Sequence, residues 1–114
     1  MKSGVAAEQT AARFLQQQGL RLIQANYRCR YGEIDLILQD GDTLVFTEVR
    51  MRSSKGFGGA AASIDARKQA KLIHTAQHYL SGLSSTPPCR FDAVLMATPD
   101  GANCIEWVKN AFEL

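Results

Sequence analysis

The chain has 114 residues, of which 46% are hydrophobic, and this composition predicts one compact domain over residues 1–114 with a substantial core. The formal charge is only +2, so any nucleic-acid binding must come from a local basic patch. No run approaches the ~20 apolar residues of a membrane span, and no secretory signal is expected at the N-terminus. Three widely spaced cysteines without a CxxC pair argue against a disulfide framework or a zinc ribbon. These features favour a cytoplasmic protein.

The first predicted element is a helix over residues 4–18 that ends at Gly19, a favoured residue after a helix C-terminus. Its apolar face is formed by Val5, Ala11, Ala12 and Leu15. Glu8 lies near the centre of this face, so packing of the helix on a sheet would bring Glu8 inward. Alternatively, Glu8 simply favours the positive N-terminal end of the helix. An extended segment at 20–27 and a basic, aromatic turn at 28–31 follow.

Residues 32–52 predict a β-hairpin with Asp40-Gly41 at its tip, because this dipeptide favours two-residue turns between alternating apolar runs. In that register, Asp35 faces Phe46 and Ile37 faces Leu44. One face then contains charged and apolar residues together: Glu33, Asp35, Ile37, Leu44, Phe46, Glu48 and Arg50. Clustered carboxylates on a partly apolar face are unfavourable alone, which predicts a divalent cation. The alternative is a solvated strand face, which the apolar neighbours of Asp35 oppose.

The second half of the chain predicts a helix and two strands. A glycine-rich loop at 53–63 precedes a helix over about 64–83, with Ser63 as its N-cap. Residues 89–98 predict a strand buried on both faces, and residues 104–108 a last strand. The long connection through the second helix permits a parallel strand pair. The predicted fold class is therefore α/β, a mixed sheet flanked by helices in the order α-β-β-β-α-β-β.

Basic residues surround the hairpin and line the second helix. Candidates for contact with nucleic acid are Arg28, Arg30, Arg52, Lys55, Arg67, Lys68 and Lys71. In the second helix, Arg67, Lys71, His74 and His78 follow one another at spacings of four, three and four residues. Such a patch can neutralise phosphates without reading base sequence. The alternative is an ordinary polar face opposite the apolar stripe of the same helix.

Several segments together resemble the YraN-like family of small, functionally uncharacterised bacterial proteins. They are Glu8, GEIDLI at 32–37, VFTEVRMR at 45–52, FGG at 57–59, Lys68, RFDAV at 90–94 and WVKNAF at 107–112. The resemblance implies a restriction-endonuclease-like fold, similar to archaeal Holliday-junction resolvases and other PD-(D/E)xK nucleases. In those nucleases, residues at the positions of Asp35 and Glu48 bind the metal, and an acidic residue in the first helix, here Glu8, often completes the site.

The sequence departs from the nuclease pattern at Arg50. That position, two after the glutamate, is normally a lysine that positions or deprotonates the attacking water. Arginine cannot be deprotonated in a protein, so it cannot act as a general base, although it can orient hydroxide or stabilise phosphorane charge. Lys68 or Lys71 could supply an amine from the second helix instead.

The resemblance therefore implies a nuclease-like protein in which Asp35, Glu48 and Glu8 hold Mg²⁺ or Mn²⁺ and Arg50 lies near the scissile phosphate. Branched or flapped DNA is the expected partner, and a homodimer is expected by analogy with the resolvases. Two alternatives stay open. One is a nucleic-acid-binding module of the same fold with lost or attenuated cleavage, and the other is a protein-interaction adaptor whose carboxylates bind a basic partner.

Overall fold

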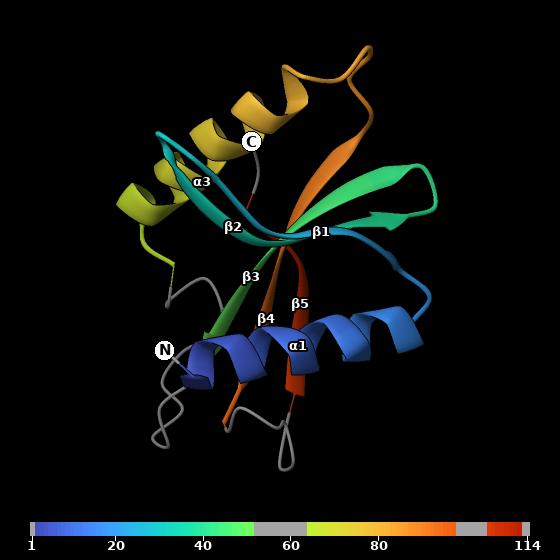
Figure 1. Cartoon of the computed structure of the whole chain (residues 1–114), viewed down its shortest axis with the longest axis vertical. Coiled ribbons are helices and arrows are strands. Elements are labelled where there is room, and N and C mark those ends of the chain that lie inside the picture. The colour runs from blue at the N-terminus through green and yellow to red at the C-terminus, as the bar shows by residue number, and fades with distance from the viewer. Residues whose placement is uncertain (1, 52–63, 98–104, 113–114) are drawn as a thin grey trace.

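The computed structural model describes residues 2–51, 64–97 and 105–112, and these form a five-stranded sheet with a helix packed on each face (Figure 1). In chain order the elements are α1 (Lys2–Gln17), β1 (Arg21–Cys29), β2 (Gly32–Asp40), β3 (Thr43–Met51), α3 (Ala66–Leu80), β4 (Cys89–Met96) and β5 (Ile105–Phe112). The strands lie side by side in the order β1-β2-β3-β4-β5. Only the β3–β4 pair is parallel among those described, and α3 lies in the connection between its strands. The predicted order α-β-β-β-α-β-β and the mixed sheet are confirmed.

Each face of the sheet buries its own apolar layer. On the α3 side the layer includes Ile37, Leu44, Phe46, Phe91 and Leu95 of the strands with Leu72 and Ala76 of the helix. On the α1 side it includes Leu36, Leu38, Val45, Val94 and Met96 with Ala7, Ala11 and Leu15. Successive residues of β4 thus belong to opposite layers, as predicted for a strand buried on both faces. Among the described residues, neither helix is long and apolar enough to cross a membrane.

The end of α1 follows from Gly19, which has a φ of +102°. The N–H of Gly19 donates to Gln16 and that of Leu20 to Leu15, the pair of bonds that defines a Schellman motif. Leu15 and Leu20 are both buried in the α1 layer, which adds the apolar contact usual for this motif. The predicted apolar face was wrong at Val5, which is 50% exposed, because the helix turns Ala7 toward the sheet instead.

The tip of the β2–β3 hairpin is shifted by one residue from the prediction. Asp40 pairs with Thr43, so Gly41 and Asp42 form the turn, and Ile37 pairs with Phe46 in place of Leu44. Gly41 has a φ of +61°, whereas Asp42 is not among the residues with positive φ, a combination that suits a type II′ turn with glycine first. The prediction put Asp40 at the position that glycine occupies. Each residue of β2 thus pairs with a residue two positions further along β3 than predicted. A shift by two residues does not change which alternate residues of the two strands share a face.

The prediction that Asp35 shares a face with Ile37 and Phe46 is wrong. Ile37 and Phe46 pack under α3, whereas the Asp35 carboxylate meets Glu8 from α1. Ile34 also packs under α3, so the alternation along β2 is interrupted between Ile34 and Leu36, which lies in the α1 layer. Asn26 lies between the Ala25↔Leu36 and Tyr27↔Ile34 pairs, opposite Asp35, with a φ of +57°. This left-handed residue marks the distortion of the two strands that turns Asp35 toward α1.

The second helix begins later than predicted. Ser63 lies outside the described residues, and the N-cap is Asp65, whose side chain accepts the Lys68 N–H at 2.9 Å. The helix ends at Leu80, so Leu83 is not part of it and is 39% exposed. The turn before β2 is also shorter than predicted, because β1 continues to Cys29 and leaves Arg30 and Tyr31 as the turn. The last strand, β5, is longer than the predicted 104–108 segment.

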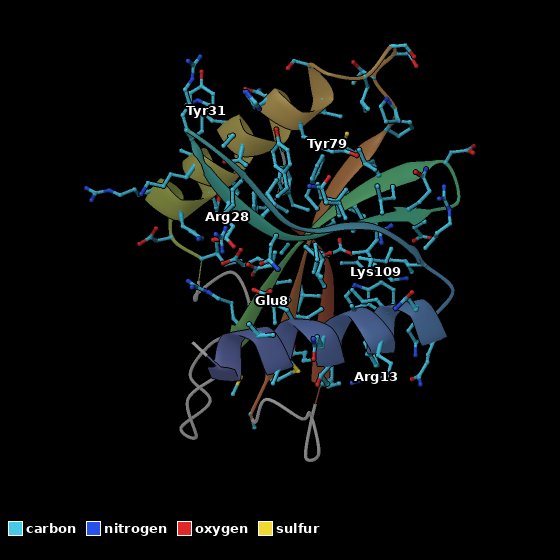
Figure 2. The ribbon with its side chains drawn as sticks, viewed as in Figure 1. Glu8, Arg13, Arg28, Tyr31, Tyr79 and Lys109 are labelled. Carbon is cyan, nitrogen blue, oxygen red and sulfur yellow. The ribbon has the colours of Figure 1, made fainter. Side chains whose placement is uncertain are left out.

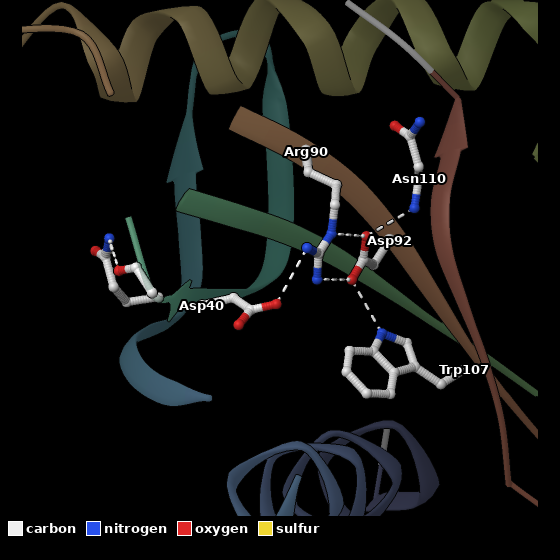
Figure 3. A network of polar contacts seen from close by, with 7 residues as sticks. Asp40, Arg90, Asp92, Trp107 and Asn110 are labelled. Atoms are coloured by element: carbon white, nitrogen blue, oxygen red, sulfur yellow. Dashed lines mark hydrogen bonds and ion pairs between the residues drawn. The ribbon is translucent and has the colours of Figure 1, made fainter. Parts of the chain in front are cut away.

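A buried carboxylate ties β4 to β5 (Figure 3). Asp92 accepts two hydrogen bonds from the Arg90 guanidinium, one from the Trp107 indole and one from the backbone N–H of Asn110, at 2.9–3.0 Å. Arg90 also pairs with Asp40 beside the β2–β3 turn at 3.1 Å. Because every one of these contacts is charge-assisted, the network fixes β2, β4 and β5 at one end of the sheet.

The start of β2 lies directly against α3. A Cβ on Gly32 would be 3.1 Å from Oγ1 of Thr75 and 4.0 Å from Cβ of Lys71, and Gly32 has a φ of +151°. Only glycine fits both the space and the backbone conformation without strain. This close approach sets the Arg30-Tyr31 turn over the helix.

We therefore expect Gly32→Ala to lower the free energy of unfolding by about 1–3 kcal/mol through backbone strain and the clash with Thr75. Denaturant unfolding measures the change. Gly82→Ala is the matched control, because a Cβ there meets only a carbonyl oxygen at 3.6 Å. Equal stability of the two variants would contradict the proposed contact.

Candidate functional site

Three carboxylates meet between α1 and the start of β2. Glu8 comes from α1, and Glu33 and Asp35 from β2; one oxygen from each lies within 4.8 Å of the others. Figure 2 shows Glu8 rising from α1 toward the sheet. The sequence predicts the meeting of Glu8 with Asp35 and puts Glu33 on the same strand face as Asp35, but the family resemblance gives Glu33 no metal role. We call Glu8, Glu33 and Asp35 the acidic cluster.

Asp35 lies where β2 and β3 cease to pair. Their pairing runs from Leu36↔Thr47 to the hairpin tip, and beyond it an Asp35 oxygen accepts the Val49 N–H at 2.8 Å. Asp35 and Glu8 also share a hydrogen bond, and the Asn26 side chain contributes another to Glu8. The carboxylate is therefore held by β3 on one side and by α1 on the other.

Glu48 of β3 is buried beside two cations. Its side chain is 7% exposed, and Oε2 lies 3.4 Å from Nζ of Lys68 and 3.9 Å from a guanidinium nitrogen of Arg50. The other oxygen, Oε1, is buried and has no hydrogen-bond partner in the described part of the chain. Of the two lysines that the sequence suggested for this position, Lys68 contacts the site, whereas Lys71 is exposed on α3.

Burial and mutual repulsion raise the pKa values of these carboxyl groups. Burial, followed by the charge of Asp35, raises the pKa of Glu8 and that of Glu48 to about 7 each. For Glu48 this rise persists although Lys68 and Arg50 both oppose it. Burial also raises the pKa of Asp35 against the opposing effect of the Val49 N–H. At neutral pH the site is therefore poised to take up a proton or another cation.

The residues fit a hard divalent cation. Two oxygens bound to one Mg²⁺ at 2.0–2.1 Å can lie at most about 4.2 Å apart. The oxygens of the acidic cluster, which lie within 4.8 Å of one another, would therefore move closer together to share one cation. Oε1 of Glu48, which has no hydrogen-bond partner among the described residues, is a further oxygen that a cation can use. An all-carboxylate donor set favours Mg²⁺, Mn²⁺ or Ca²⁺ over Zn²⁺.

The predicted basic residues separate into three groups. Arg28 pairs with Glu33 of the acidic cluster at 3.3 Å, and its side chain remains 74% exposed. Arg67 and Lys71 are exposed on α3, and Arg30 is exposed in the turn before β2. Arg52 and Lys55 lie outside the described residues.

One cluster was missed by the sequence reasoning. His74 and His78 were grouped with the basic stripe of the second helix, but both rings contact Tyr31, with centroids 5.8 and 5.9 Å from its ring centroid. Their spacing of four residues shows that they share a helix face. The spacing does not show which turn of the chain lies over that face, because the position of the Tyr31 turn depends on the close approach of Gly32 to α3.

We expect Glu48→Gln to raise the free energy of unfolding by about 1–2 kcal/mol in metal-free buffer above pH 7, because it removes a buried charge that the fold disfavours. Denaturant unfolding with a chelator present measures the change. Asp92→Asn is the control, because Asp92 has partners at both oxygens; its loss should cost about 3 kcal/mol. Destabilisation by both variants would contradict an unfavourable charge at Glu48.

The same shift predicts a pH dependence. The folded chain holds the Glu48 proton more tightly than the unfolded chain, whose pKa is near 4.5. The contribution of this group to stability is therefore full below about pH 4.5 and is lost as the pH rises to about 7. The difference in stability between Glu48→Gln and the unchanged protein should grow over that interval and then level off. A constant difference across the interval would show that Glu48 ionises normally.

Comparison with known proteins places the chain in a family. A model described as the uncharacterised protein family UPF0102 matches residues 7–96. A UPF0102 protein of Nitrosomonas europaea is 63% identical over 110 residues, which span 96% of this chain and 92% of the relative. A UPF0102 protein of Nitrosospira multiformis is 53% identical over 111 residues, 97% of this chain and 92% of the relative. The membership expected from the residues is confirmed: the chain belongs to the UPF0102 family of uncharacterised bacterial proteins.

Proposed function

We propose that this protein binds DNA and cleaves its phosphodiester bonds with Mg²⁺ or Mn²⁺, on a fold of the restriction-endonuclease type. The observation that supports the proposal most directly is the acidic cluster, together with a buried Glu48 that pairs with Lys68 and whose pKa is raised by burial and by the charge of Asp35. Burying several carboxylates together is unfavourable unless they serve a ligand. The ligand that matches an all-oxygen donor set is a hard divalent cation.

In this proposal Asp35, Glu8 and Glu48 hold the cation, and Glu33 is a further donor. A bound cation would supply Lewis-acid chemistry, lowering the pKa of water and offsetting charge on the phosphate. Asp35 would keep its orientation through the Val49 N–H, which donates to one of its oxygens. Residues fixed in this way need little reorganisation at the moment of reaction.

Lys68 is the residue we propose for the role that a lysine usually fills next to the catalytic glutamate. Arg50 occupies that position in the sequence and cannot accept a proton. The Lys68 ammonium lies 3.4 Å from Glu48, closer than the Arg50 guanidinium at 3.9 Å. It can orient an attacking water or hydroxide, and Arg50 can stabilise negative charge on the phosphate.

The exposed basic residues of α3, of the end of β1 and of the turn before β2 would contact the DNA backbone. Arg67, Lys71, Arg28 and Arg30 can neutralise phosphates without reading bases, so their contribution should fall with salt. A preference for branched or flapped DNA, and assembly as a homodimer, are part of the proposal by analogy with the junction resolvases.

A second candidate is a module that binds DNA without cutting it. The observation that favours it is that Lys68 and Arg50 both lie beside Glu48. In a module without catalysis, these two cations would serve to neutralise the buried glutamate, and no general base would be needed. The two candidates share metal and DNA binding and differ only in cleavage.

We expect Mn²⁺ to bind the unchanged protein, as followed by its paramagnetic broadening of backbone amide resonances around Asp35, and to bind much more weakly to Asp35→Asn. Asp92→Asn lies in a different carboxylate network and is the control for nonspecific effects of charge loss. Absence of Mn²⁺ binding to the unchanged protein would rule out the nuclease and leave the adaptor reading in its place.

We expect cleavage of flapped or branched DNA with Mn²⁺ to fall by roughly 100-fold or more in Lys68→Ala, the range for loss of a group that assists proton transfer. Lys71→Ala is the matched control, because it removes the same charge from the same helix without touching Glu48; it should lose only part of a phosphate contact. Asp35→Asn serves as the contamination control. Equal loss in both lysine variants would assign Lys68 to DNA binding alone. Metal and DNA binding without cleavage would select the second candidate, and a gain of cleavage in Arg50→Lys would then show an attenuated site.

A further inference from the structure

An open pocket lies between the turn before β2 and the C-terminal half of α3. It has a volume of about 500 Å³ and is lined by Arg30, Tyr31, His74, Gln77, His78 and Ser81. A second cavity, of about 380 Å³, shares Gln77 and Ser81 and continues to Leu80 and Thr86. The two together form a track along α3. None of these lining residues is acidic, although the acidic cluster begins only two residues from Tyr31, at Glu33.

Tyr31 is the centre of the first cavity, which we call the Tyr31 pocket. The Arg30 guanidinium lies over its ring, 5.0 Å from the centroid, and also donates to its hydroxyl at 3.0 Å. The rings of His74 and His78 meet the Tyr31 ring edge-on. Tyr31 nevertheless remains 40% exposed, so part of its ring is open to a ligand.

The pocket residues are held in place by contacts with the apolar layer of the sheet. The Tyr27 hydroxyl and Nδ1 of His78 are hydrogen-bonded at 2.5 Å, and the Tyr27 ring packs edge-on against Tyr79 in the apolar layer. When the Tyr27 hydroxyl donates, Nε2 of His78 bears the ring proton and is a donor for a ligand. The Gly32 contact with Thr75 holds the turn in place. The site is therefore built from side chains that the core positions.

We propose that the Tyr31 pocket binds unpaired nucleotides of a single-stranded DNA segment. This inference rests on the proposed function, because it assigns the kind of DNA that the acidic cluster would act on. Single-stranded nucleic acid is recognised by aromatic rings and Arg planes that stack on bases, together with cations that follow the backbone. The pocket combines a half-exposed Tyr, an Arg and two His with the amide of Gln77, and its volume lies in the range of small-ligand sites.

The helix α3 carries both Lys68, which lies beside Glu48, and the two histidines of the Tyr31 pocket. Lys68, beside Glu48, precedes His74 by six residues and His78 by ten, which at ~1.5 Å per residue places the histidines ~9 and ~15 Å further along the helix axis. That span equals roughly three to four nucleotide steps of 3.4 Å. A strand with its scissile phosphate at the acidic cluster could thus place unpaired bases in the Tyr31 pocket. The substrate class is a duplex that continues into a single strand.

The test compares a blunt duplex with the same duplex extended by a single-stranded thymidine tail. Affinities are measured by fluorescence anisotropy in the presence of a chelator, so that cleavage plays no part. We expect the unchanged protein to bind the tailed duplex roughly tenfold to a hundredfold more tightly, the range for stacking of one base. Tyr31→Ala should remove this preference and leave binding of the blunt duplex unchanged, and Tyr31→Phe, which keeps the ring, should retain the preference.

Two further variants separate stacking from charge. Arg30→Ala should reduce the preference, whereas Arg13→Ala should leave it intact, because Arg13 is exposed on α1, on the other side of the sheet (Figure 2). Asp35→Asn should also keep the preference, since the acidic cluster plays no part in it. A preference that survives Tyr31→Ala, or equal binding of the two duplexes by the unchanged protein, would overturn the pocket assignment and leave the nuclease proposal standing. Failure to bind either duplex would overturn both.

Discussion

The hydrogen bond from the Val49 N–H to the Asp35 carboxylate is the contact on which the site depends. It lies at the point where β2 leaves β3, and the carboxylate there takes the place of a backbone acceptor. A strand edge that loses its partner would otherwise leave a buried N–H unsatisfied. Where β2 no longer pairs with β3, its first residues pass over α3. The same separation of the strands brings Asp35 close to Glu8 and Gly32 close to Thr75.

Asp92 on β4 and Glu48 on β3 are both buried carboxylates, but they differ in how completely their oxygens are paired. Asp92 has partners at both oxygens, and these partners come from β4 and β5, so its charge strengthens the fold. Glu48 has cations on one oxygen and none of the described groups on the other, and burial outweighs those cations in setting its pKa. Since the chain can satisfy a buried carboxylate fully, the incomplete environment of Glu48 is a property of that position.

The sequence predicted what depends on local patterns and missed what depends on strand bending. Alternation and turn residues were enough for the order of elements, the mixed sheet and the end of α1 at Gly19. The hairpin tip was misplaced because Asp40-Gly41 and Gly41-Asp42 are both acceptable turns. Alternation put Glu33 beside Asp35, but the side of the sheet taken by Asp35 could not be predicted, since Asn26 adopts a left-handed conformation that a regular strand does not contain. The contact of Tyr31 with His74 and His78 was missed for a similar reason, because only the folded chain brings that turn to α3.

Besides packing on the core, α3 has a second role, which is to position Lys68. Its buried face, through Leu72 and Ala76, packs on a layer of the sheet that includes Phe46 of β3, and this packing places Lys68 beside Glu48. An ammonium supplied from a helix is not constrained by strand alternation, so position 50 is free to be an arginine. On the same helix, His74 and His78 follow Lys68 by six and ten residues and contact Tyr31. Because one helix carries Lys68 and both histidines, the separation of Lys68 from the Tyr31 pocket along the helix axis is fixed by α-helical geometry and not by a flexible loop.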